Sequence, residues 1–159
     1  MGRTRFNLGD NIIDSRDVIK RIEELESDLA DLKQAVDDAK ENVESWKGYE
    51  EFADELEDAK TEIKEAEAAL EEWDDKDEYE ALKQLENEFS GYGDWDHGET
   101  LILDSHFEDY ARELAEETCD MKNSNQWPFS CIDWEEAANE LKGDYVSADA
   151  DGYTYWMRA

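Results

Sequence analysis

The chain has 159 residues, of which 47 are Asp or Glu and 16 are Lys or Arg, so its net charge is -31. A surface this negative repels nucleic acids and anionic membranes, and we expect the protein to bind neither directly. Acidic disordered segments are poor in aromatic residues, whereas this chain has six Trp, seven Tyr and five Phe. The composition therefore predicts a folded, non-membrane protein with a strongly negative surface.

Two further features bear on the compartment. The N-terminus has no apolar segment of the kind that follows the basic residues of a secretory signal. The only cysteines, Cys119 and Cys131, are too few for a disulfide framework, which favours reduced thiols in a cytoplasmic protein.

Residues 1–15 have balanced charge and no clear periodicity, and we expect an irregular lead-in there. Asp14 or Ser15 is placed to cap a helix that follows. From there, apolar residues recur at alternating intervals of four and three, which is the heptad pattern of a coiled coil. They are Val18, Ile22, Leu25, Leu29, Leu32, Val36, Ala39, Val43 and Trp46.

A second heptad series runs through Phe52, Leu56, Ala59, Ile63, Ala66, Leu70 and Trp73. It is out of phase with the first, and the break coincides with Gly48. Because Gly commonly lies just past a helix end, the break indicates an antiparallel helical hairpin. One long helix, locally over- or under-wound at the break, is the alternative.

Residues 74–77 interrupt the second series and begin a third helix, with Tyr79, Leu82, Leu85 and Phe89 on its inner face. Residues 16–90 therefore form an acidic coiled-coil and helical region. Residues 91–159 lack heptads and contain turn formers and aromatic residues, which predicts a small acidic α+β module. The predicted fold is mainly α: an N-terminal antiparallel coiled-coil hairpin, then an α+β module that ends in a β-hairpin.

Local signals place the elements of this second module. Ser105 and Glu108 have capping-box spacing, and Asp133 is placed to cap another helix. Asp151-Gly152 lies between two short alternating runs, which is typical of a two-residue hairpin turn.

The spacing of the acids approaches that of phosphates on DNA. Residues 16–90 contain 28 acids and 10 bases, or one acid per roughly 4 Å of helix at 1.5 Å per residue. Two antiparallel helices would halve that interval, and subtracting the bases gives one net charge per about 3 Å, against about 1.7 Å for duplex DNA. The module at 91–159 is also acidic, with 17 acids and 4 bases.

Motifs for catalysis or metal binding are absent from the sequence. His97, His106, Cys119 and Cys131 have no zinc-site spacing. Residues 149–152 match only part of a calcium loop. There is no phosphate loop, dinucleotide fingerprint or nucleophile elbow. We therefore expect no catalytic residue, no metal and no cofactor.

The C-terminal module resembles the ArdA-type antirestriction proteins of phages and mobile elements. The resemblance lies in residues 107–115 (FEDYARELA), 132–141 (IDWEEAANEL), Asp144-Tyr145 and 152–158 (GYTYWMR). Residues 11–19 (NIIDSRDVI) are similar to the start of phage accessory proteins that place a coiled coil before such a module. The chain differs from the ArdA family in having helices where the family has an N-terminal α/β domain.

The resemblance implies a DNA mimic, dimeric in that family, that occupies the DNA groove of type I restriction-modification enzymes in the bacterial cytoplasm. It implies partner-binding roles for Glu108, Asp109, Glu113, Asp133, Glu135, Glu136, Glu140 and Asp144. On the hairpin the acids we expect to contact the partner are Glu23, Glu24, Asp31, Asp38, Glu55, Asp58 and Glu62.

The sequence thus predicts a non-enzymatic inhibitor of a host DNA-binding defence complex. We expect the target to be the type I restriction-modification enzyme that the resemblance implies, or a CRISPR effector, whose nucleic-acid channel is equally basic. A coiled-coil scaffold or dimerisation protein, whose acidity serves solubility, is the alternative.

Overall fold

The computed structural model describes residues 6–119, 121 and 125–159, which divide into two compact units. The hairpin unit comprises residues 22–79, and the sheet unit comprises the chain up to residue 21 together with residues 80–159. The predicted boundary at residue 90 therefore falls inside a unit. The helical hairpin is an insertion between two parts of the sheet unit.

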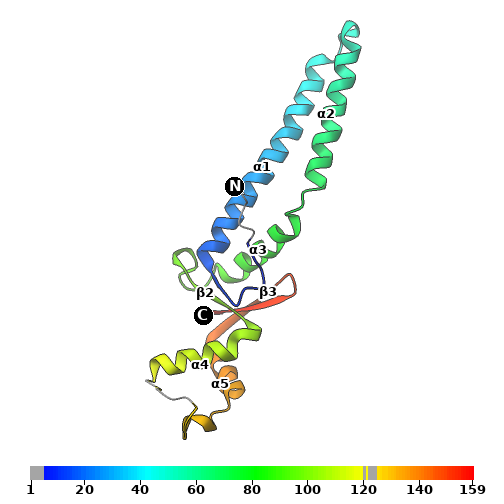
Figure 1. Ribbon diagram of the computed structural model, residues 1–159. Helices are drawn as coiled ribbons and strands as arrows, with labels where there is room; N and C mark the ends of the chain where they lie inside the picture. The colour runs from blue at the N-terminus through cyan, green and yellow to red at the C-terminus, as the bar shows by residue number, and fades with distance from the viewer. Residues whose placement is uncertain (1–5, 120, 122–124) are drawn as a thin grey trace. The chain divides into compact units, whose positions relative to one another are not determined.

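The hairpin unit confirms the predicted antiparallel pair of helices (Figure 1). Helix α1 (Ser15–Trp46) ends two residues before Gly48, whose φ of 92° few other residues adopt. A 3₁₀ turn (Glu50–Phe52) then leads into α2 (Ala53–Glu71). The alternative of one continuous helix is wrong.

Both heptad series form the narrow core of the hairpin. Every residue of the two series in this unit is buried or half-buried, except Phe52, which is 36% exposed. Near the turn, the Trp46 and Phe52 rings lie 5.4 Å apart. The apolar faces of α1 and α2 cover each other within one chain, so these helices do not require a second copy to cover them.

The sheet unit is built on four antiparallel strands in the order β1-β2-β4-β3. They are β1 (Ile12–Asp14), β2 (Thr100–Leu103), β3 (Tyr145–Ala150) and β4 (Tyr153–Arg158). The expected irregular lead-in is thus wrong for residues 12–14, which pair with β2 in the register Ile13↔Leu101.

The residues just before β1 are also held in place. The Tyr155 hydroxyl accepts a hydrogen bond from the Gly9 N–H at 2.9 Å and donates one to the Asp10 carbonyl at 3.1 Å. Burial raises the pKa of Tyr155. The rest of the predicted lead-in, residues 1–5, lies outside the described residues.

The predicted hairpin at Asp151-Gly152 is confirmed. It joins β3 to β4, and both turn residues have positive φ, 49° for Asp151 and 79° for Gly152. Positive φ at both central residues is what a type I′ turn requires, and the twist of that turn matches that of the paired strands.

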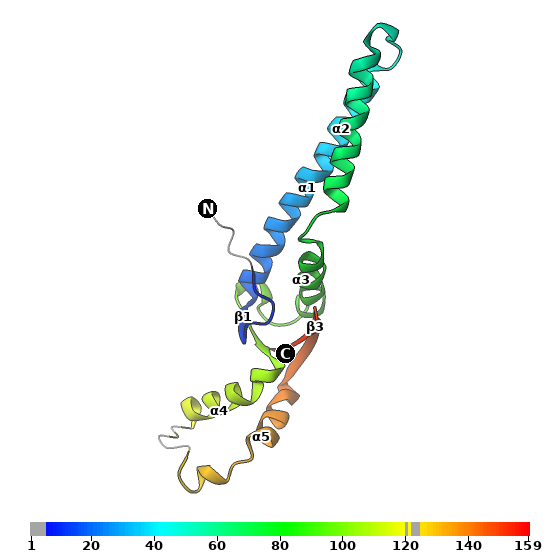
Figure 2. The same ribbon diagram turned by 45° about the vertical axis from the view of Figure 1, so that its right-hand side comes forward.

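Helices cover both faces of the sheet (Figures 1 and 2). Helix α4 (Phe107–Thr118) and helix α5 (Trp134–Leu141) lie on one face, where Ile102, Phe107, Ala111 and Ala138 form a buried cluster. The end of α3 (Lys76–Phe89) lies on the other side. The predicted inner residues Leu82, Leu85 and Phe89 are fully buried.

The two predicted caps of the α+β module have different outcomes. The Asp133 carboxylate accepts the Glu136 N–H at 3.1 Å and caps α5 as expected. The capping box at Ser105 is wrong, because a 3₁₀ turn (Asp104–His106) includes Ser105 and moves the start of α4 to Phe107. His106 occupies the N-cap position and makes no side-chain cap.

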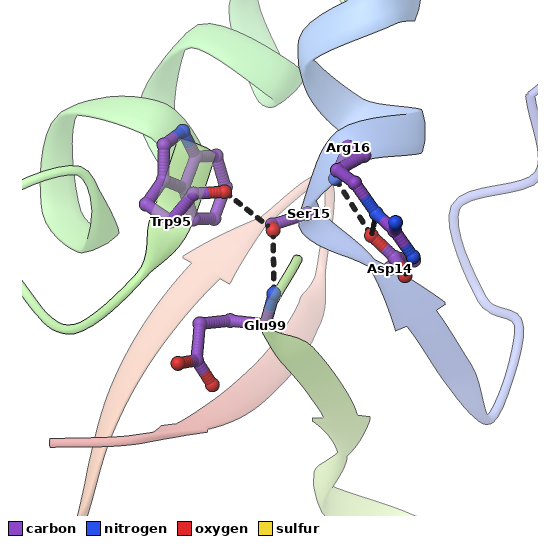
Figure 3. Close-up of polar contacts among 5 residues, drawn as sticks. All are labelled: Asp14, Ser15, Arg16, Trp95 and Glu99. Carbon is purple, nitrogen blue, oxygen red and sulfur yellow. Dashed lines mark hydrogen bonds and ion pairs between the residues drawn. The ribbon is translucent and has the colours of Figure 1, made fainter. Parts of the chain in front are cut away.

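The start of α1 uses both candidate caps in different ways (Figure 3). The Asp14 carboxylate accepts the Arg16 N–H at 2.9 Å, and the Arg16 guanidinium lowers the pKa of Asp14. Ser15 is fully buried: its hydroxyl donates to the Trp95 carbonyl at 2.7 Å and accepts the Glu99 N–H at 2.8 Å. One hydroxyl thereby links the beginning of α1 to the segment that enters β2.

We predict that Ser15→Ala lowers the free energy of unfolding by about 2 kcal/mol, because it removes the hydroxyl that pairs with a carbonyl and an N–H. Urea unfolding followed by circular dichroism measures the change. The control is Ser45→Ala, at an exposed serine whose hydroxyl bonds only to its own helix. Equal stability of Ser15→Ala and wild type would show that water replaces the hydroxyl.

Candidate partner-binding surface

The C-terminal acids predicted to contact a partner lie on one pair of helices. Helix α4 presents Glu108, Asp109 and Glu113, and α5 presents Glu135, Glu136 and Glu140. Asp133 and Asp144 flank α5. All eight residues are exposed. Because α4 and α5 pack against each other, the fold brings together acids from two segments about 20 residues apart in sequence.

Aromatic contacts hold this helix pair on the sheet. The Phe107 ring centroid lies 5.1 Å from that of Tyr145 and 5.9 Å from that of Trp156. The Tyr110 and Tyr145 hydroxyls lie 3.1 Å apart, and burial together with this contact raises the pKa of Tyr145. The Arg112 guanidinium stacks 5.3 Å from the Trp134 ring centroid and so connects α4 to α5.

Asp104 has a structural role that sequence reasoning missed. Its carboxylate accepts hydrogen bonds from the Lys142 ammonium and the Trp156 indole N–H, both at 2.7 Å. These two bonds lower its pKa, the Lys142 bond having the larger effect. The Lys142 nitrogen also lies 4.9 Å from the Trp156 ring and 5.2 Å from the Phe107 ring. Lys142 therefore pairs with Asp104 and with two aromatic rings of the fold.

The predicted hairpin acids are exposed as well. Glu23, Glu24, Asp31 and Asp38 lie on α1, and Glu55, Asp58 and Glu62 lie on α2. The hairpin unit contains 24 acids and 6 bases, so its ion pairs, such as Lys40–Glu67 at 3.3 Å, leave a large excess of negative charge.

A groove of about 580 Å³ lies between α1 and α2. Its lining combines small residues with polar and acidic ones: Ala35, Asp38, Ala39, Asn42, Glu62, Glu65 and Ala66. It includes two of the predicted partner-binding acids, Asp38 and Glu62. Asn42 donates a hydrogen bond to Glu62 across the two helices at 3.0 Å.

Within the described part of the chain, no group of three or more His, Cys, Asp or Glu side chains is placed to hold a metal ion. His106 lies 3.8 Å from Asp109, and Cys119 and Cys131 are exposed free thiols. None of the helices described has the length and apolar character that a membrane crossing requires.

Comparisons with models of protein families, with curated proteins and with solved structures found no match. The resemblance to ArdA-type proteins rests on the quoted residues alone.

We predict that Asp104→Ala lowers the free energy of unfolding by about 1–3 kcal/mol, because the Lys142 ammonium and Trp156 indole lose their shared acceptor. The pKa of Asp104 is lower in the folded than in the unfolded chain, so its contribution is present at neutral pH. That contribution disappears as the pH falls below the ordinary value of 3.8.

Urea unfolding at pH 7 and at pH 3 measures both effects. The control is Asp109→Ala, which removes a charge that is 70% exposed from the next helix. A deficit of the same size at both pH values would contradict an electrostatic role for Asp104.

We also predict that the melting temperature rises by about 3–8 °C when NaCl increases from 10 to 300 mM, because salt screens repulsion among exposed carboxylates. Thermal unfolding followed by circular dichroism measures the shift. A variant with amides at Glu108, Asp109, Glu113, Glu135, Glu136 and Glu140 should show a smaller rise. A melting temperature that falls with salt would mean that specific ion pairs outweigh the repulsion.

Proposed function

We propose that this protein is a DNA mimic that inhibits a host DNA-binding defence complex by occupying its nucleic-acid cleft. The observation that carries the proposal is the exposure of all fifteen predicted acids, on two units of different architecture. A charge excess confined to a coiled coil would be an ordinary solvated surface. Its presence in an unrelated α+β unit supports a role for the charge itself.

The dimensions of the hairpin support this role. Residues 22–46 and α2 together contain 17 acids and 4 bases, and the longer segment extends about 38 Å at 1.5 Å per residue. This is one net negative charge per about 3 Å, over a length close to one turn of DNA. A groove lined with Lys and Arg would release counterions on binding this surface, as it does on binding phosphates.

The proposed targets are a type I restriction-modification enzyme and a CRISPR effector, both in the host cytoplasm. No catalytic step, metal or cofactor enters this function. The alternative of a dimerisation scaffold is less favoured, because the hairpin closes its seam within one chain.

The test is displacement of DNA. Fluorescently labelled duplex is bound to a purified type I methyltransferase or to a guide-loaded CRISPR effector, and the protein is titrated in while anisotropy is recorded. We expect displacement at 50 mM salt and a loss of affinity of at least about tenfold at 200 mM. Failure to displace DNA from either complex at low salt would reject the proposal for these targets.

Two clustered variants test the two acidic surfaces. One carries amides at Glu108, Asp109, Glu113, Glu135, Glu136 and Glu140, and the other carries them at Glu23, Glu24, Asp31, Asp38, Glu55, Asp58 and Glu62. We expect each to weaken inhibition progressively with the number of changes, whereas a single amide does little. A single substitution that abolishes inhibition would indicate a discrete site instead.

A further inference from the structure

Trp127 differs from the other five tryptophans in its exposure to solvent. Trp95 is buried, and Trp46, Trp73, Trp134 and Trp156 are half-buried. Trp127 is 82% exposed, the largest exposure of any large hydrophobic side chain described. Exposing an indole to water is unfavourable, and Trp is the residue type most enriched among those that dominate binding energy in protein interfaces.

The segment around Trp127 is also exceptional in charge. Residues 121–132 contain no Asp or Glu, and this is the longest such run in a chain where 47 of 159 residues are acidic. Phe129 is half-buried, and Ile132 is 36% exposed. Acids resume at once on either side, with five on α4 and three on α5.

An apolar centre inside a charged rim is the anatomy of a protein–protein interface, whose core is depleted of Asp and Glu and enriched in aromatic residues. The two helices that flank this segment in sequence, α4 and α5, are acidic, so a surface complementary to both is basic. A second copy of this chain would bring another 31 negative charges and is repelled. Nucleic acids and anionic lipids are repelled for the same reason.

We propose that Trp127 is an anchor that inserts into an apolar pocket of a protein partner, with the acids of α4 and α5 pairing with basic residues around that pocket. This rests on the proposed function and extends it. Carboxylates that imitate phosphates match every DNA-binding cleft to some degree, whereas an indole fits only a cleft with an adjacent apolar pocket. Trp127 would therefore determine which basic protein is bound.

The test begins with a photo-crosslinking residue in place of Gln126, an exposed neighbour, so that Trp127 stays intact. The full chain is irradiated in a bacterial lysate, and a chain with the crosslinker at Tyr92, which is 44% exposed in another loop, is the control. We expect adducts from position 126 in excess over position 92. They should join a different protein, at a site next to Lys or Arg.

The captured protein is then purified, and its affinity is measured for wild type, Trp127→Ala, Trp127→Phe and Tyr92→Ala. We expect Trp127→Ala to weaken binding by at least about tenfold at both 50 and 200 mM salt, since burial of an indole is not screened. Trp127→Phe should retain most of the affinity, and Tyr92→Ala all of it. The clustered amide variant of α4 and α5 should bind more weakly than wild type at 50 mM salt, and the difference in affinity should be smaller at 200 mM.

The proposal is overturned if position 126 gives no excess of adducts, or if its adducts join a second copy of the chain. It is also overturned if wild type binds zwitterionic lipid vesicles and Trp127→Ala does not. Unchanged affinity of Trp127→Ala for the captured protein would overturn it as well. The two proposals fail separately. If Trp127→Ala weakens binding to a protein from which DNA does not displace the chain, the anchor stands and DNA mimicry fails. If DNA displaces the chain but Trp127→Ala binds normally, DNA mimicry stands and the anchor fails.

Discussion

Repulsion among 31 uncompensated negative charges is the constraint under which the whole structure forms. A compact core enclosed by such a surface would bring carboxylates close together on all sides. The hairpin unit spreads them along two helices that need only a narrow apolar seam. The sheet unit concentrates its apolar residues on the two faces of a small four-stranded sheet. In both units the acids are left at the surface, where water and salt reduce their repulsion.

Periodic features of the fold were predictable from sequence, because they depend on residues near one another in the chain. The heptad series located the helical hairpin, Gly48 marked its turn, and Asp151-Gly152 marked the β-hairpin. Strand β1 was not predictable in this way. It is three residues long, too short to show alternation, and its partner β2 lies almost 90 residues later. Only long-range pairing makes residues 12–14 a strand.

The same distinction applies to polar residues. Asp133 caps the helix that begins beside it, and sequence spacing predicted this. The Ser105 capping box failed because a 3₁₀ turn placed His106 at the helix start. Ser15 and Asp104 acquire their roles from Trp95, Glu99, Lys142 and Trp156, all at least 38 residues away. No local pattern distinguishes these two residues from the other serines and aspartates.

The candidate surface was predictable in composition and not in arrangement. The composition predicted a strongly negative surface, and all fifteen acids predicted to bind a partner are exposed. That α4 and α5 lie together follows from the buried hydrophobic cluster around Phe107, which includes Ala138 of α5, and from the stacking of Arg112 on Trp134. Residues 121–132 carry one sequence signal, the absence of acids, and it becomes informative once Trp127 is seen to be exposed.

Charge and the indole contribute differently to recognition. Long-range attraction between an acidic surface and a basic cleft accelerates association, but it acts on every basic cleft and weakens with salt. Short-range burial of an aromatic side chain acts only after contact, mainly slows dissociation, and depends on the shape of the pocket. A protein that used charge alone would be distributed among all the DNA-binding proteins of a cell. An exposed tryptophan, in an acid-free stretch of sequence between two acidic helices, would add selectivity without reducing that attraction.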